Sequence, residues 1–160
     1  GSEMCIRDRA YYADHVELSD NGNDFGTQIG IGGVIGSKFT YPKDNPNVRK
    51  RYVLTPEKEK LYKKWVSIYN DKMISTGNYI NLYDIAYDKP ETHVINKDGK
   101  MYYAFYADQW NGEPIELRGL EKRKYTVCEY TSDEKKTYEI DGENPVITPY
   151  FTRNYLIEVY

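Results

Sequence analysis

Side chains that can exchange protons gather near the start of the chain, where Asp14, His15 and Glu17 stand in the segment ADHVELS. Carboxylates beside an imidazole are residue types used in general acid–base catalysis, and histidine titrates near physiological pH. Alternation along an extended strand places Asp14 and His15 on opposite faces, so the spacing predicts no compact triad. The competing interpretations are a hydrogen-bonded structural histidine and two surface or capping carboxylates.

Aromatic side chains form the second group with a chemical role, because the chain holds 18 tyrosines as well as Trp65 and Trp110. An aromatic face packs against the apolar side of a pyranose while a hydroxyl group finds a polar partner. The same residues also fill strands because of their β-propensity, so we assign most of them to packing and edge positions. Tyr41 is the strongest candidate for stacking on a sugar, and Trp110 in DQWNGE is interpreted as a local packing anchor.

Two other kinds of chemistry are not supported by the sequence. Cys5 and Cys128 provide neither a disulfide framework nor a zinc site. After Gly30 and Gly32, the dinucleotide pattern G-x-G-x-x-G requires a third glycine where Ile35 stands. The sequence therefore predicts no metal and no nucleotide cofactor.

The composition is that of an ordinary globular protein, with 160 residues, 39% hydrophobic and 29% charged side chains, and a net charge of -3. This charge balance offers no basic field for nucleic acid. No apolar run approaches the ~20 residues that a membrane-spanning helix needs. We therefore expect neither a nucleic-acid partner nor a membrane partner.

The first residues, GSEMCIRDR, fit neither a signal peptide nor a folding element, because they contain no apolar stretch and no small-residue cleavage site. Residues 1–9 resemble the in-frame translation of a transposase sequencing adapter, and this resemblance implies an artefactual leader. We expect the protein's own sequence to begin near Ala10. The competing interpretation is a native disordered terminus.

The first half of the chain shows strand and helix signals in alternation. Residues 11–18 predict a short strand, Asp24 can cap a short helical segment through Gly30, and the glycine-rich residues that follow predict a loop and a buried strand.

The strongest helix signal begins at Thr55, the expected N-cap, with Pro56 at the first helical position and Gly77 as the expected stop. Its predicted packing face consists of Leu61, Trp65, Ile68, Tyr69 and Met73. Its predicted solvated side chains are Lys58, Lys60, Lys63, Lys64 and Lys72.

From Tyr79 onward the pattern changes to short strands separated by turn residues. The predicted strands are YINLYDIAY, THVIN, KMYYAFYA, PIELRGL, KYTVCEY, KTYEI, PVITPYF and NYLIEVY. Asp98-Gly99 predicts a two-residue hairpin, while Asn111-Gly112 and Asp141-Gly142 mark further turns. Short links between antiparallel strands favour a β-sandwich.

The order of these elements resembles the C-terminal portion of the melibiase-type α-galactosidases of glycoside hydrolase family 36. The resemblance is carried by DHVELS, GGVIGSKFTYP, LTPEKEKLYKKW, THVINKDGKMYYAFYA and IELRGLEKRKYTVCEY. It implies an α+β fragment, in which the last two β/α units of a (β/α)8 barrel, a TIM barrel, precede a C-terminal antiparallel β-sandwich. The implied division is a barrel remnant at 10–77 and a sandwich domain at 78–160.

The resemblance also implies retention of anomeric configuration by two carboxylates ~5 to 5.5 Å apart. Both catalytic motifs of the family precede DHVELS, so we assign no catalytic residue within this chain. Barrel active sites lie at the C-terminal ends of strands, which singles out a set of substrate-binding candidates. They are His15, Glu17, Lys38, Thr40 and Tyr41.

The resemblance thus implies the C-terminal part of an enzyme that cleaves terminal α-galactosides of oligosaccharides or plant galactomannans. The 160-residue chain alone is expected to be inactive and, with unpaired barrel edges, prone to self-association. The alternative is a non-catalytic carbohydrate-associated β-sandwich module. Other barrel glycosidases with sandwich tails form a third possibility, because a fold alone does not define a substrate.

Overall fold

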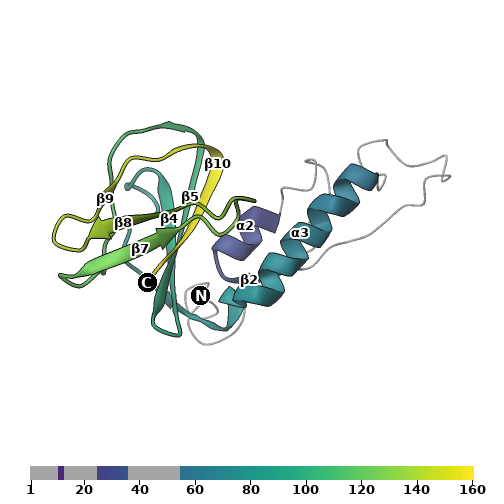
Figure 1. Ribbon diagram of the computed structural model, residues 1–160, viewed down its shortest axis with the longest axis horizontal. Coiled ribbons are helices and arrows are strands. Elements are labelled where there is room, and N and C mark those ends of the chain that lie inside the picture. Colours follow the sequence, from purple (N-terminus) through teal and green to yellow (C-terminus); the bar gives the residue numbers. More distant parts are fainter. Residues whose placement is uncertain (1–10, 13–24, 36–54) are drawn as a thin grey trace. The chain divides into compact units, whose positions relative to one another are not determined.

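The computed structural model describes residues 11–12, 25–35 and 55–160. The chain divides into two compact units, residues 1–75 and residues 76–160, and each is described by itself. Figure 1 shows the helices of the first unit and the strands of the second. The interpretation of three segments as a leader, a barrel remnant and a sandwich remains a prediction.

The first unit contains a pair of short parallel strands connected through a helix. Strand β1, Tyr11–Tyr12, pairs with strand β2, Gly33–Val34, and helix α2, Phe25–Gly30, lies between them in the sequence. Parallel neighbours require such a crossover connection. The expected helical segment ending at Gly30 is confirmed, whereas the rest of the strand predicted at residues 11–18 lies outside the described residues. The described residues of this unit, 11–12, 25–35 and 55–75, do not make up a complete barrel unit.

Helix α3, Pro56–Lys72, begins where the sequence predicts and ends earlier than predicted. The Thr55 hydroxyl accepts a hydrogen bond from the Lys58 backbone N–H at 3.2 Å, which satisfies one of the free amides of the first turn. The helix stops at Met73, which adopts a left-handed conformation with φ 45°, and the short 3-10 helix η2, Ile74–Thr76, follows. Gly77 instead allows a close approach to strand β4, since a Cβ there would lie 2.5 Å from Ile95 Cγ2.

The buried face of α3 is rotated from the predicted face. Trp65 is buried as expected, but its buried companions on the helix are Tyr62 and Lys58. Lys58 is only 9% exposed, although we expected it to be solvated. A lysine can bury its aliphatic stem along an apolar surface. The prediction, which assigned the lysines of the helix to the solvent-exposed face, did not allow for this. The ring of Tyr62 meets the ring of Phe25 edge to face at 5.7 Å, so α2 packs against α3.

The second unit consists mainly of antiparallel sheet. Six strands form one sheet in the order β3-β4-β5-β10-β7-β8, and β6 pairs with β9 in a second, two-stranded sheet. The strands are β3 (Asn78–Ile80), β4 (Glu91–Lys97), β5 (Lys100–Asn111), β6 (Ile115–Glu116), β7 (Lys124–Cys128), β8 (Thr137–Asp141), β9 (Val146–Ile147) and β10 (Tyr150–Val159). This arrangement is consistent with a C-terminal β-sandwich.

The core of the second unit lies on one face of the six-stranded sheet. Alternate residues of β5, including Tyr103 and Phe105, pack with alternate residues of β10, including Ile157. Ile115 and Ile147 add apolar side chains from the two-stranded sheet. Every member of this buried cluster belongs to residues 76–160, so the second unit has a hydrophobic core of its own.

Local turn chemistry explains which strand predictions hold. The hairpin at Asp98 and Gly99 is confirmed, with φ values of 52° and 77°. The single strand predicted from Tyr79 to Tyr87 is wrong beyond Ile80. Asp84 Oδ1 accepts from the Ala86 N–H at 2.9 Å and turns the chain there.

The predicted strand PVITPYF is also divided between two sheets. Val146–Ile147 forms β9 in the two-stranded sheet, whereas Tyr150 already begins β10 in the six-stranded sheet. Pro149 lies between them and has no N–H to donate to a sheet, so the chain changes partner at this point.

Candidate functional site

The predicted substrate-binding residues lie outside the described residues. They are His15, Glu17, Lys38, Thr40 and Tyr41. In the sequence, His15 and Glu17 follow β1, whereas Lys38, Thr40 and Tyr41 follow β2. Their role as sugar contacts stays a prediction.

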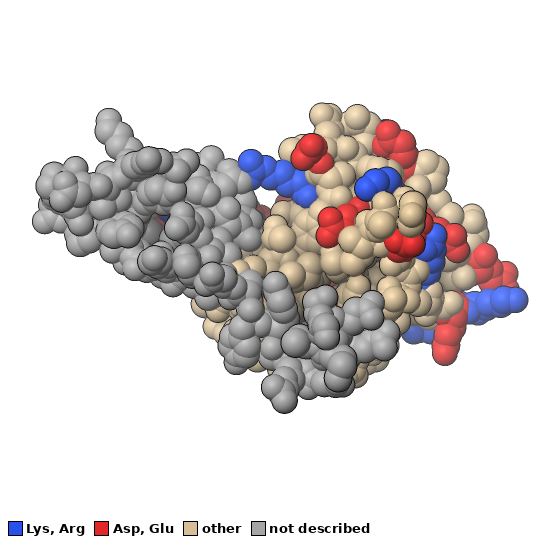
Figure 2. All heavy atoms as spheres, turned by 180° about the vertical axis from the view of Figure 1, so that it is seen from behind, with Lys and Arg blue, Asp and Glu red and all other residues tan. Residues whose placement is uncertain are grey.

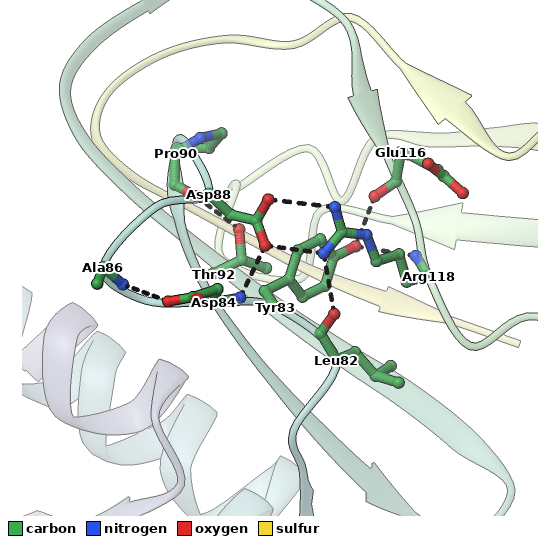
Figure 3. Close-up of polar contacts among 9 residues, drawn as sticks. All are labelled: Leu82, Tyr83, Asp84, Ala86, Asp88, Pro90, Thr92, Glu116 and Arg118. Carbon is green, nitrogen blue, oxygen red and sulfur yellow. Dashed lines mark hydrogen bonds and ion pairs between the residues drawn. The ribbon is translucent and has the colours of Figure 1, made fainter.

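A polar cluster around Arg118 is the most connected group of charged side chains in the described part of the chain (Figure 3). The guanidinium donates to Asp88 Oδ2 at 2.8 Å and to Asp88 Oδ1 at 3.1 Å, a bidentate ion pair. It also donates to the Leu82 carbonyl oxygen at 3.0 Å. One arginine therefore ties two points of the 82–88 segment to the strand region around β6.

Tyr83 completes the cluster from inside the core. Its hydroxyl donates to the Glu116 carbonyl oxygen at 2.5 Å and accepts from the Arg118 N–H at 2.9 Å. The Arg118 guanidinium carbon also lies 4.7 Å from the centre of the Tyr83 ring, within the range of a cation–π contact. Backbone groups therefore satisfy the Tyr83 hydroxyl both as a hydrogen-bond donor and as an acceptor.

The electrostatics of this cluster oppose proton transfer at neutral pH. The hydrogen bond from Arg118, together with one from the Asp84 N–H, holds the pKa of Asp88 below its ordinary value. Burial raises the pKa of Tyr83 to about 12. The carboxylate therefore stays ionised and the phenol stays neutral, and both Asp88 oxygens already accept from Arg118. We interpret this cluster as a structural clamp.

A second cluster joins His93 and Glu91 on β4 to tyrosines of the neighbouring strands. His93 Nε2 lies 2.7 Å from Glu91 Oε1, and the imidazole faces the rings of Tyr79 and Tyr106 at 6.2 and 6.0 Å. Burial raises the pKa of Tyr106. An imidazole with a single carboxylate does not supply the pair of carboxylates that retaining glycoside hydrolysis needs. The cluster orients a histidine within an aromatic surface of the sheet.

Trp110 is confirmed as a packing anchor. Its ring stacks on Phe151 of β10 with a centroid distance of 6.4 Å and an interplanar angle of 17°. Its indole N–H donates to the Glu113 carbonyl oxygen at 2.9 Å and closes the turn after β5. The Trp110 side chain therefore stabilises the pairing of β5 with β10 and the turn that follows β5.

The described residues hold no group of three or more His, Cys, Asp or Glu side chains that could bind a metal ion. Within the same residues, no helix has the length and apolar character needed to cross a membrane. On the face shown in Figure 2, Lys and Arg side chains are interspersed with Asp and Glu, and no patch of one sign dominates the described surface there.

Sequence reasoning missed the Arg118 cluster and the role of Tyr83. The residues of the ion pair, Asp88 and Arg118, belong to no recognisable motif, and they meet only because the 82–88 segment folds back onto β6. The Asp-rich segment YDIAYDKP carried a weak turn signal, which the strand prediction overrode.

The chain is similar to a protein of Flavonifractor plautii named A type blood alpha-D-galactosamine galactosaminidase. The two sequences are 35% identical over 118 residues, which covers 69% of this chain. The chain spans 11% of the length of that relative. No family model matches the sequence.

Proposed function

We propose that this chain is the C-terminal part of a retaining, α-galactosidase-like glycoside hydrolase of family 36 that removes terminal α-galactosides. The observation that carries the proposal is the 35% identity over 118 residues to a relative whose name describes a galactosaminidase. That name extends the expected substrates to α-linked galactosamine, in which an amino group replaces the 2-hydroxyl group of galactose. A carbohydrate substrate is the coarser conclusion that this similarity supports.

The length of the similarity favours the enzyme over the isolated module. The matched region covers 69% of the chain, more residues than the second unit at 76–160 contains. The similarity therefore reaches into the first unit, which includes the parallel strands and α3. A module that consisted of the sandwich alone would account for the second unit only.

In the proposed mechanism, the nucleophile and the acid/base carboxylate come from sequence upstream of this chain. The residues predicted after β1 and β2 contribute substrate contacts. Tyr41 stacks on the apolar face of the sugar, while His15 and Glu17 hydrogen bond to its hydroxyl groups. Lys38 and Thr40 supply further donors from the second strand. The chemistry requires no metal and no cofactor from this chain.

The alternative function is a non-catalytic carbohydrate-associated β-sandwich module. Its support is the separate hydrophobic core of the second unit, together with Tyr150, an exposed tyrosine at the start of β10. The two functions differ in what precedes Ala10. Upstream barrel strands with two suitably placed carboxylates favour the enzyme, whereas an unrelated domain favours the module.

The decisive experiment begins with sequencing the source DNA across the Arg9–Ala10 junction and expressing the complete open reading frame. The whole protein should hydrolyse a p-nitrophenyl α-galactoside or α-galactosaminide, and NMR of the first product should show retained configuration. The purified 160-residue chain should show no turnover. Turnover by the chain alone would contradict the assignment of the catalytic carboxylates to upstream sequence.

A further inference from the structure

The outer surface of the β5–β10 pair, near the turn after β5, carries an unusual set of exposed side chains. In the sheet register Tyr150 lies opposite Asn111 and Thr152 lies opposite Gln109, so the four side chains share one face. All four are exposed. We call this set, Gln109, Asn111, Tyr150 and Thr152, the Tyr150 surface.

The ring of Tyr150 is supported by backbone but open to solvent. Its side chain is 78% exposed. Its hydroxyl end lies against Gly112, where a Cβ would stand 2.6 Å from the Tyr150 Cζ atom. Gly112 also has φ 82°, a conformation that favours glycine. The glycine therefore leaves room for the ring, and most of the aromatic surface remains available to a ligand.

The two amides beside the ring offer complementary hydrogen-bonding groups. Gln109 Nε2 donates to Asn111 Oδ1 at 2.9 Å, which orients both side chains. Among the described residues, Gln109 Oε1 has no hydrogen-bond partner, and neither has Asn111 Nδ2. One acceptor and one donor at neighbouring positions suit hydroxyl groups, which both donate and accept.

The opposite face of the same strand pair holds this surface in place. Trp110 stacks on Phe151, and Phe151 stacks on Tyr155 at 5.7 Å with an interplanar angle of 12°. Across the turn, the Gly112 N–H donates to the Pro149 carbonyl oxygen at 3.0 Å, and the Asn111 N–H donates to Glu113 Oε2 at 2.9 Å. A fixed backbone lowers the entropy lost on binding.

We propose that the Tyr150 surface binds a neutral hexopyranose glycan, with the sugar's apolar face on the Tyr150 ring and its hydroxyl groups on the two amides. An aromatic face next to amide and hydroxyl groups fits a neutral sugar, because these groups can donate to and accept from its hydroxyl groups. The ligand class rests on the proposed carbohydrate function. The surface is separate in sequence from the predicted substrate contacts at 15–41, so it serves as an accessory glycan contact.

The test titrates the 160-residue chain with raffinose, an α-galactosyl oligosaccharide, by isothermal titration calorimetry and by saturation-transfer NMR. Tyr150→Ala should weaken binding at least about tenfold, a change equivalent to ~1.4 kcal/mol. Asn111→Ala should weaken it less, because the aromatic contact remains. Tyr87→Ala is the matched control, since Tyr87 is 84% exposed but lies in the 84–88 turn, away from these amides in the sequence. Thermal unfolding confirms that each variant is folded.

Three results would overturn the inference. They are an absence of wild-type binding at sugar concentrations up to about 10 mM, unchanged binding by Tyr150→Ala, and an equal loss with Tyr87→Ala. Failure of this binding test is distinguishable from failure of the proposed function. The proposed function is tested by substrate turnover of the protein expressed from the complete open reading frame. Tyr150-dependent binding without turnover by the whole protein would support this inference and favour the non-catalytic module.

Discussion

Tyr83 and Arg118 show how single residues hold a loop on the sheet. The Tyr83 hydroxyl joins the Glu116 carbonyl oxygen to the Arg118 N–H, and the Arg118 side chain reaches Asp88 and the Leu82 carbonyl oxygen. These contacts replace the regular ladder that the chain abandons after β3. Buried polar groups with filled partners stabilise a loop, and the same groups are costly when a partner is removed.

Removal of the Tyr83 hydroxyl should measurably destabilise the second unit. Tyr83→Phe keeps the ring but leaves the Glu116 carbonyl oxygen and the Arg118 N–H without this partner. We expect a loss of about 1–3 kcal/mol in the free energy of unfolding. Urea unfolding followed by circular dichroism measures it. Tyr87→Phe, the same change at an exposed tyrosine, should have little effect, and equal losses in both variants would contradict the role of the Tyr83 hydroxyl.

The contribution of the Asp88–Arg118 pair should depend on pH. The folded-state pKa of Asp88 is lowered from an ordinary value near 3.8, so the ionised pair adds stability above that value. This stability is lost as the pH falls through the lowered folded-state pKa. Asp88→Asn should therefore lower the melting temperature at pH 7, and the difference from wild type should shrink at pH 3 and below.

Asp108→Asn is the control for this measurement, because Asp108 is an exposed carboxylate of β5 with no ion pair among the described residues. It should leave the melting temperature nearly unchanged at both pH values. A difference between Asp88→Asn and wild type that persisted in acid would show that the ion pair is not its source. Solvent screens this half-exposed pair, so we expect a modest effect.

At the scale of elements, two turn glycines make different demands on the structure. Gly99 has φ 77° in the β4–β5 hairpin, and a Cβ there would meet no atom within 4 Å. Gly142, after β8, is buried, and a Cβ there would collide with the backbone carbonyl of Glu121. The first glycine is required by conformation and the second by space.

This difference predicts unequal costs for alanine substitution. Gly99→Ala should cost about 1 kcal/mol, since only the left-handed conformation is unfavourable. Gly142→Ala should cost more, in the range of about 2–3 kcal/mol or above, because a backbone atom cannot move aside as a side chain does. Chemical denaturation of the two variants measures the order. Equal costs would contradict the close approach at Gly142.

Helix α3 begins with a cap that can be tested in the same way. Thr55→Ala removes the acceptor for the Lys58 N–H and should destabilise the first turn by about 0.5–2 kcal/mol. Hydrogen exchange of the backbone amides at 57–60 should become faster. Ser67→Ala, at an exposed position within the helix, should not accelerate exchange there. Unchanged exchange in Thr55→Ala would show that the cap contributes nothing.

At the scale of the whole molecule, the two units should behave differently when separated. Residues 76–160 contain a complete core, whereas the described strands of residues 1–75 form a parallel pair of two residues each. Among the described residues, neither outer edge of this two-stranded sheet is paired with a further strand. We expect residues 76–160 to unfold cooperatively and elute as a monomer, and the full chain to self-associate. Light scattering after size-exclusion chromatography measures both, and a monomeric full chain would contradict the prediction.

The sequence by itself determined the features that depend on neighbours along the chain. The start of α3 at Thr55, the hairpin at Asp98-Gly99 and the short strands after Tyr79 follow from capping, positive φ and alternation, which are local. The substrate contacts His15, Glu17, Lys38, Thr40 and Tyr41 follow from the family resemblance and remain predictions. Only the tertiary structure decided which strands meet. Strand β10 lies between β5 and β7, and its pairing with β5 brings Tyr150 beside Asn111. The Arg118 side chain likewise forms an ion pair with Asp88, which lies 30 residues away in the sequence. Such contacts depend on burial of a shared core and on backbone groups that need partners, and neither leaves a fixed spacing in the sequence.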